Sequence, residues 1–138
     1  MADKDYSATP LWKKLGMRDG SRVAIIDAPA GFRSLIEPLP KEVRVSTRAS
    51  NPQDVIVAFE LREKGLGGRL AKLARALDPA GGLWIAYPKK TSKLETDLTF
   101  ESVQETGLAA GLVDNKICAI DHDWSAVRFV YRLKDRPR

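Results

Sequence analysis

The stretch DVIVAFE, residues Asp54–Glu60, holds five consecutive apolar residues between two acids. An apolar run of this length, without polar alternation, is typical of a strand that is covered on both faces, as in the centre of a parallel sheet. Two similar runs lie on either side of it along the chain, at Arg22–Asp27 (RVAIID) and Gly82–Tyr87 (GLWIAY). With the alternating stretch Val43–Thr47, they predict four strands of a mostly parallel sheet.

Helix patterns separate these strands. Leucines at intervals of four, three and four residues run from Leu66 to Leu77, so they share one face of a helix that Asp78 and Pro79 are expected to end. Three further helices are expected: a short one between Thr9, its cap, and Gly16, and two more at Phe32–Leu39 and Thr99–Ala110. Strands that alternate with helices predict an α/β fold with helices on both faces of the sheet.

The last part of the sequence predicts a hairpin. Lys116–Ile120 and Val127–Leu133 are strand-like, and the six residues Asp121–Ala126 between them are too few for a crossover helix, so the pair is antiparallel. Right-handed crossovers between the parallel strands then predict a Rossmann-like three-layer sandwich. Its six strands follow the order 2-1-3-4-6-5, numbered along the chain, and the last strand is antiparallel to the others.

The composition is ordinary for a soluble globular protein, with 43% hydrophobic and 30% charged residues among 138. This length predicts a single domain over residues 1–138, with residues 1–8 as a loose N-terminal arm and 134–138 as a frayed tail. No apolar run approaches the ~18 residues of a membrane span, and the polar start MADKDYSATP is unlike a signal peptide. We therefore expect a cytoplasmic protein without membrane contact. One cysteine, Cys118, and one histidine exclude an intrachain disulfide and a Cys/His zinc cluster.

The predicted strand order resembles that of the class I methyltransferases, relatives of the Rossmann fold whose sheet also ends in a hairpin. The best local match is Leu77–Ile85 (LDPAGGLWI), which is similar to the turn that leads into the fifth strand of that fold. A helix and a strand of that fold are missing after Val43–Thr47.

The chain also resembles a family of small bacterial proteins of unknown function. This resemblance depends on the stretches TPLWKKLGMRDGSRVAIIDAPAGF (residues 9–32), GLWIAYPKK (82–90) and TGLAAGLVDNKICAIDHDWSAVRF (106–129). It implies a Rossmann-like fold and a bacterial, cytoplasmic setting, and it supplies no catalytic residues.

Ligands of a doubly wound sheet lie at the carboxyl ends of its strands. The crevice expected there is lined by Asp27–Gly31, Thr47–Arg48, Phe59–Leu61 and Pro88–Lys90. An adenosyl or nicotinamide cofactor needs a glycine-rich first loop, but residues 27–32 (DAPAGF) offer one glycine, and Pro29 has no N–H to donate. The second strand is followed by Arg48 rather than by an acid that would bind a ribose. We therefore expect neither S-adenosylmethionine nor a nicotinamide cofactor.

Two acids are candidates for chemistry in this crevice. Asp27 ends the first strand and Glu60 the third, so their carboxylates could act as general acid and base. The alternative is that Asp27 binds backbone donors of the next turn and that Glu60 is a solvated loop acid. Arg48 is a candidate for binding a phosphate, or it is a solvated loop residue.

Lys89 and Lys90 are the clearest indication of a ligand. They follow a buried strand at the same edge of the sheet, where helix N-termini add positive potential, so they are expected to attract an anion. Because side chains alternate along a strand, at most one of them is expected to reach the crevice directly. The candidate ligand-binding residues are therefore Asp27, Gly31, Arg48, Glu60, Lys89 and Lys90.

Three further patterns suggest other activities. Arg69, Lys72 and Arg75 form a basic stripe beside the leucine face, which could contact nucleic-acid phosphates or could be a solvated helix surface. The run Asp121–Asp123 contains His122 between two acids, but three consecutive loop residues rarely converge on one metal ion, so no metal is expected. Cys118 lies in an apolar strand and is expected to be buried rather than nucleophilic.

The sequence thus predicts a non-catalytic domain that binds a small anionic ligand or a protein partner. Two alternatives stay open at this point: a minimal S-adenosylmethionine-dependent methyltransferase with an atypical first loop, and a basic protein that associates with nucleic acid.

Overall fold

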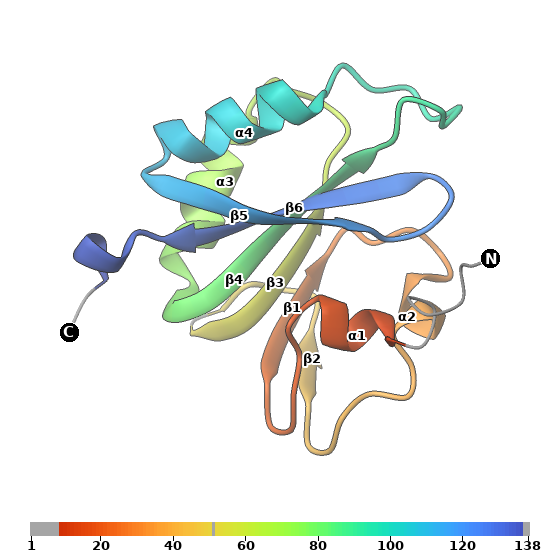
Figure 1. The fold of residues 1–138 in the computed structure, drawn as a ribbon, viewed down its shortest axis with the longest axis vertical. Helices are drawn as coiled ribbons and strands as arrows, with labels where there is room; N and C mark the ends of the chain where they lie inside the picture. Colours follow the sequence, from red (N-terminus) through yellow and green to blue (C-terminus); the bar gives the residue numbers. More distant parts are fainter. Residues whose placement is uncertain (1–8, 51, 137–138) are drawn as a thin grey trace.

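The computed structural model describes residues 9–50 and 52–136. It contains one six-stranded sheet with the order β2-β1-β3-β4-β6-β5 (Figure 1). The strands are β1 (Arg22–Ile26), β2 (Arg44–Ser46), β3 (Gln53–Phe59), β4 (Leu77–Pro88), β5 (Leu112–Ala119) and β6 (Trp124–Tyr131). The pairs among β1 to β4 are parallel, whereas β6 pairs antiparallel with both β4 and β5. The predicted α/β fold, strand order and antiparallel last strand are confirmed.

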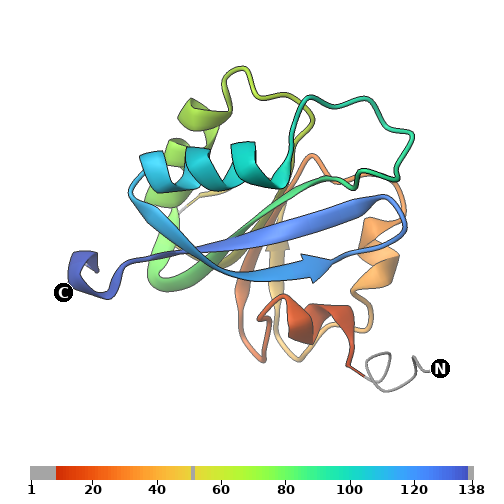
Figure 2. The ribbon, with the colours of Figure 1, turned by 45° about the horizontal axis from the view of Figure 1, so that its top comes forward.

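Helices cover both faces of this sheet, in three layers (Figures 1 and 2). On one face, α3 (Leu66–Arg75) and α4 (Phe100–Ala109) pack over a cluster that includes Ile85 and Phe129. On the other, the short helices α1 (Leu11–Lys14) and α2 (Phe32–Leu35) lie against a second cluster around Trp84. A turn of 3-10 helix, η2 (Leu133–Asp135), follows the last strand.

The centre of the sheet is buried on both faces, as the apolar runs predict. Residues 55–59 of β3 and 81–88 of β4 are all buried. Fully buried Trp84 ties the sheet to the α1 layer, because its Nε1 donates a hydrogen bond of 2.9 Å to the carbonyl of Leu15. A buried indole N–H needs such an acceptor, so this bond fixes where the segment after α1 lies.

The leucine helix is shorter than the sequence predicts. It ends at Arg75, and buried Leu77 opens β4 instead of completing the helix face. The amide of Gln53 donates to the carbonyl of Ala76 at 2.8 Å, which draws the segment after the helix into the sheet beside β3. Asp78 and Pro79 therefore belong to the strand and do not end the helix.

Other boundaries also differ from the predictions. The first helix has Pro10, not Thr9, at its N-cap position, and no side chain caps it. The second ends at Leu35 instead of Leu39. Strand β5 begins at Leu112, four residues before the predicted start, because a bulge between Asp114 and Lys116 keeps the longer strand in register with β6. The predicted N-terminal arm, residues 1–8, and the last two residues of the predicted tail lie outside the described residues. Along residues 9–50 and 52–136, no helix has the length and apolar character needed to cross a membrane.

An ion-pair network joins three strands at the amino edge of the sheet. The Arg22 guanidinium bonds to Asp54 at 2.8 Å and to Asp78 at 3.3 Å, and the Arg22 backbone N–H donates to the same Asp54 carboxylate. The hydrogen bond from the Arg22 side chain lowers the pKa of Asp54, against a smaller opposing effect of burial.

Replacing Asp54 with Asn is expected to cost up to about 1 kcal/mol near neutral pH, since both side chains of the pair are more than one-third exposed to screening solvent. A carboxyl with a lowered pKa in the folded state stabilises the fold above its unfolded pKa of about 4, and this contribution disappears as pH falls through the folded value. The difference between the parent and D54N in urea unfolding should therefore shrink steadily below about pH 4. A difference that stays constant down to pH 2 would contradict the ion-pair assignment.

Candidate functional site

The structure forms two separate cavities where the sequence predicts one crevice. The first lies between the carboxyl ends of β1 and β3, where the strand order reverses direction, and it has a volume of about 530 Å³. We call it the β1–β3 cavity. Its lining consists of Ile26, Asp27, Thr47, Arg48, Ala49, Ser50, Glu60, Arg69, Lys72 and Leu73. In open α/β sheets such a switch point is where ligands bind.

Three predicted site residues, Asp27, Arg48 and Glu60, meet in this cavity, but Glu60 is not free. Its side chain is only 9% exposed, and its Oε1 accepts a hydrogen bond from Nε of Arg69 at 3.0 Å and forms an ion pair with Nη2 of the same side chain at 2.8 Å. The same guanidinium donates to the carbonyls of Arg62 and Lys64. Glu60 is thus the buried anchor of the segment that enters α3, and not the solvated loop acid of the sequence-based alternative.

Of the two predicted site residues in the loop after β1, Asp27 lines the β1–β3 cavity and Gly31 does not. Asp27 is exposed at the end of β1, with a left-handed backbone (φ 56°) that Asp tolerates better than most residues. Its side chain makes no hydrogen bond or ion pair with the described residues, so the predicted capping of the next turn by Asp27 is not found there. Gly31 lies outside both cavities, at the N-cap of α2.

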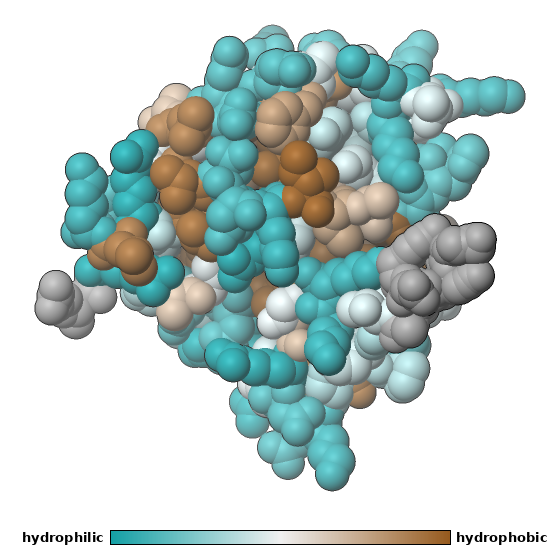
Figure 3. All heavy atoms as spheres, in the orientation of Figure 1, coloured by the Kyte–Doolittle hydropathy of each residue, from teal (hydrophilic) through white to brown (hydrophobic). Residues whose placement is uncertain are grey.

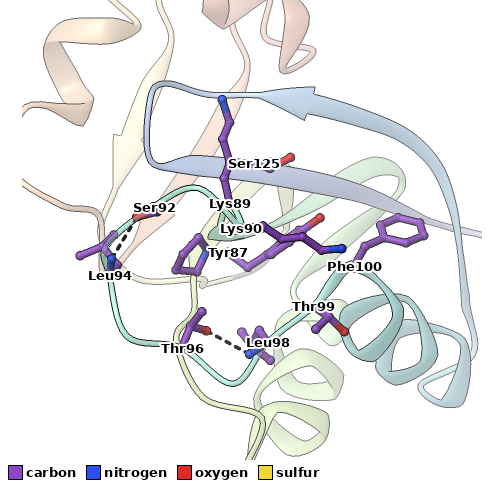
Figure 4. A pocket seen from close by; sticks show the side chains of 11 residues that line it. Tyr87, Lys89, Lys90, Ser92, Leu94, Thr96, Leu98, Thr99, Phe100 and Ser125 are labelled. Atoms are coloured by element: carbon purple, nitrogen blue, oxygen red, sulfur yellow. Dashed lines mark hydrogen bonds between the residues drawn. The ribbon is translucent and has the colours of Figure 1, made fainter.

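The second cavity, of about 470 Å³, contains both predicted lysines, and we call it the lysine cavity (Figure 4). It is lined by Tyr87, Pro88, Lys89, Lys90, Ser92, Leu94, Thr96, Leu98, Thr99, Phe100 and Ser125. The two lysine side chains diverge, with Lys90 on the side of Phe100. Both residues contribute to the lining, and the prediction that at most one of the two side chains reaches a ligand directly stays a prediction.

Hydrogen bonds hold the loop that forms the wall of the lysine cavity. The Ser92 hydroxyl donates to Asp123 in the β5–β6 turn at 2.9 Å, and the Lys89 amide donates to the Asp123 carbonyl at 2.8 Å. Further along, the Thr96 hydroxyl donates to the carbonyl of Leu61 at 2.7 Å. Tyr87 forms part of the buried floor, and its burial raises the pKa of its hydroxyl. The cavity is thus built from segments that are distant in sequence and fixed to one another.

The three cations of the predicted basic stripe have different surroundings. Arg69 is engaged by Glu60, and Lys72 lines the β1–β3 cavity, while Arg75 is exposed and lies outside it. A contact of this helix with nucleic-acid phosphates stays a prediction.

The other candidates have structural partners. Asp121 accepts hydrogen bonds from the amides of Asp123 and Trp124 and thereby closes the hairpin turn. No group of three His, Cys, Asp or Glu side chains within the described part of the chain is placed to hold a metal ion. Cys118 is buried, as predicted, and burial raises the pKa of its thiol, which disfavours the nucleophilic thiolate.

Sequence reasoning missed the partnership of Glu60 with Arg69 and the loop residues that complete the lysine cavity. The two ionic partners are nine residues apart across a turn, a spacing that matches no helical or strand periodicity. A weak signal existed for the loop, because Ser92, Thr96 and Thr99 are residue types that bond to nearby backbone amides.

Comparison with known proteins shows which solved structures share this fold. No protein-family model and no curated sequence matches the chain, so membership of the small bacterial family stays a prediction. Among solved structures, it is similar to a TehB-like SAM-dependent methyltransferase from Corynebacterium glutamicum, with 17% identity, a TM-score of 0.56 and coverage of 83% of this chain and 82% of that one.

It is also similar to the magnesium protoporphyrin IX methyltransferase of Synechocystis with bound SAH (10% identity, TM-score 0.62, coverage of 92% and 81%). A putative methyltransferase from Thermoplasma acidophilum matches with 11% identity, a TM-score of 0.55 and coverage of 91% and 75%. At these identities the likeness concerns the fold alone. The chain therefore has a methyltransferase-like Rossmann fold.

Proposed function

We propose that this domain binds a small anionic ligand without converting it, and that the ligand lies in the lysine cavity. The observation that supports this most directly is the lining of that cavity, which among the described residues includes two lysines and no Asp or Glu. The Lys89 backbone is held by the β5–β6 turn through its amide, which fixes the point at which the lysine side chains leave the strand. An anion there would gain charge-assisted hydrogen bonds.

A non-catalytic role is supported by how the reactive groups of the chain are used. Glu60 is paired with Arg69, and Cys118 is a buried thiol with a raised pKa. Asp121 closes a turn through backbone hydrogen bonds. A general base or nucleophile has to be available to the substrate, and these three groups are occupied or covered. Asp27 is exposed in the β1–β3 cavity, but Glu60, its predicted acid–base partner, is engaged by Arg69.

Of the two ligand classes that the sequence predicts, we retain the anion. On the face of the molecule seen in Figure 3, hydrophobic side chains lie in small groups that hydrophilic side chains separate. That view does not favour an extended apolar docking surface for a protein partner. The basic lining of a formed cavity is the more specific feature.

Replacing both Lys89 and Lys90 with Gln is expected to weaken binding of inorganic phosphate about tenfold at low salt, since two favourable charges are lost. The difference should shrink at high salt, and stability should stay within about 0.5 kcal/mol per site, because neither ammonium group forms an ion pair or hydrogen bond with the described residues. Binding is followed by the amide NMR shifts of residues 87–100 during phosphate titration. Lys93→Gln is the matched control, because Lys93 is exposed in the same loop but does not line the cavity.

Two results would contradict this proposal. If the double variant binds phosphate as tightly as the parent, the anion site is elsewhere, and if it unfolds, the lysines are structural. The competing function, a minimal methyltransferase, has the fold of its structural neighbours in its favour. It requires S-adenosylmethionine binding, for which we expect no affinity in the millimolar range or tighter, and micromolar binding by calorimetry would favour that alternative.

A further inference from the structure

The β1–β3 cavity lies where a methyltransferase-like fold would take its adenosyl cofactor, at the switch point between β1 and β3. Three features of the cavity show whether its residues fit S-adenosylmethionine. They are the loop after β1, the residues after β2, and the acid that ends β3.

The loop after β1 offers no cradle for a cofactor. A Cβ added to Gly31 would meet nothing within 4 Å among the described residues. Glycine is therefore needed here for its positive φ of 93°, and not to let the backbone approach a ligand closely. Pro29 has no N–H, and its carbonyl, like that of Gly31, accepts a hydrogen bond from the turn of α2. These two carbonyls of the loop are therefore already used in hydrogen bonds to the start of α2.

The position after β2 carries the wrong charge for this cofactor, and the acid that ends β3 is already paired with an arginine. The segment after β2 presents Thr47 and Arg48, and the hydroxyl of Ser46 fixes the Arg48 backbone by accepting from its amide at 3.0 Å and donating to its carbonyl at 2.9 Å. A cation stands where a ribose diol would need a carboxylate. Glu60 is neutralised by Arg69. The residues present do not fit S-adenosylmethionine.

What they do fit is a phosphate on an apolar body. With Glu60 and Arg69 cancelling each other, Arg48 and Lys72 remain against Asp27, which leaves one excess positive charge in the cavity. Ile26, Ala49 and Leu73 supply apolar lining in the same cavity. A guanidinium and an ammonium on separate elements can bind one phosphate group together, while the apolar side chains cover the rest of the ligand.

We infer that the β1–β3 cavity is a site for a phosphate monoester with an apolar body, bound by Arg48 and Lys72, in place of the adenosyl cofactor of the fold. Asp27 lines the same cavity and opposes the bound phosphate. The site is independent of the lysine cavity, since the two linings share no residue.

Phenyl phosphate is the probe, with inorganic phosphate and phenol as its two halves. Titration followed by amide NMR shifts should give saturable changes at residues 26–28, 47–50 and 72–74. Arg48→Gln with Lys72→Gln should weaken this binding at least about tenfold, because both phosphate ligands are lost. Arg75→Gln, three residues further on the same helix and outside the cavity, should leave it unchanged.

Asp27→Asn distinguishes a charge effect on the bound phosphate from a purely structural role of Asp27. Removing the opposing charge should tighten phenyl phosphate binding about two- to fivefold, and the gain should diminish at high salt. The inference is overturned if phenyl phosphate gives no saturable shifts, if it shifts only the lysine-cavity amides, if the double variant binds like the parent, or if S-adenosylmethionine binds at micromolar concentration. Lys89→Gln with Lys90→Gln should not change this binding, so failure of the proposed lysine site is distinguishable from failure of this one.

Discussion

Replacing Arg69 with Ala is expected to destabilise the protein by about 2–3 kcal/mol, because it leaves a buried carboxylate without its counter-charge. Glu60 has a side chain that is 9% exposed, and the Arg69 guanidinium supplies both its hydrogen bond and its ion-pair contact. The value lies below the ~3–5 kcal/mol that is usual for breaking a fully buried pair, since the Arg69 side chain is 44% exposed and water can reach Glu60 once it is removed. Urea unfolding, with midpoint and slope compared between variants, gives the measurement.

A second substitution separates the ion pair from the other contacts of Arg69. Glu60→Gln in the Arg69→Ala background removes the uncompensated charge, so the double variant should recover at least about 1 kcal/mol relative to Arg69→Ala. Lys72→Ala, on the exposed side of the same helix, is the control and should stay within about 0.5 kcal/mol of the parent. If Arg69→Ala is as stable as the parent, Glu60 is not an anchor, and its interpretation as a general acid or base returns.

Replacing Gly107 with Ala is expected to destabilise the protein by about 1–3 kcal/mol, although alanine is the better helix former by about 1 kcal/mol. A Cβ at this position would lie 2.0 Å from Cε1 of Phe129, whose ring is fully buried on β6. Helix α4 therefore packs directly against the Phe129 ring at Gly107, where there is no room for a side chain. A methyl group there would force the helix or the ring to move.

The same substitution at Gly68 should have the opposite sign. Gly68 lies within α3, and a Cβ there would meet nothing within 4 Å. Gly68→Ala should therefore raise the free energy of unfolding by up to about 1 kcal/mol, through helix propensity alone. Equal effects at the two glycines in thermal and urea unfolding would show that α4 does not pack as closely on Phe129 as the structure has it.

The fold was predictable because its signals are local. The apolar run of β3 and the short connection predicted at Asp121–Ala126 are properties of consecutive residues, and they suffice to order six strands once right-handed crossovers are assumed. The connection is shorter still in the structure, where β6 begins at Trp124. The boundaries were less predictable. Leu77 continues a helical period and yet opens β4, because pairing with β3 outweighs local propensity.

The chemistry of the sites was decided by the tertiary structure. The sequence identifies Asp27, Arg48, Glu60, Lys89 and Lys90 as residues at the carboxyl edge, but only folding separates them into two cavities. Arg69, in the sequence one member of a basic stripe, becomes the partner of Glu60. Strand and helix periodicities report which face a residue occupies, whereas a cavity depends on distances between side chains from segments that meet only in the folded chain.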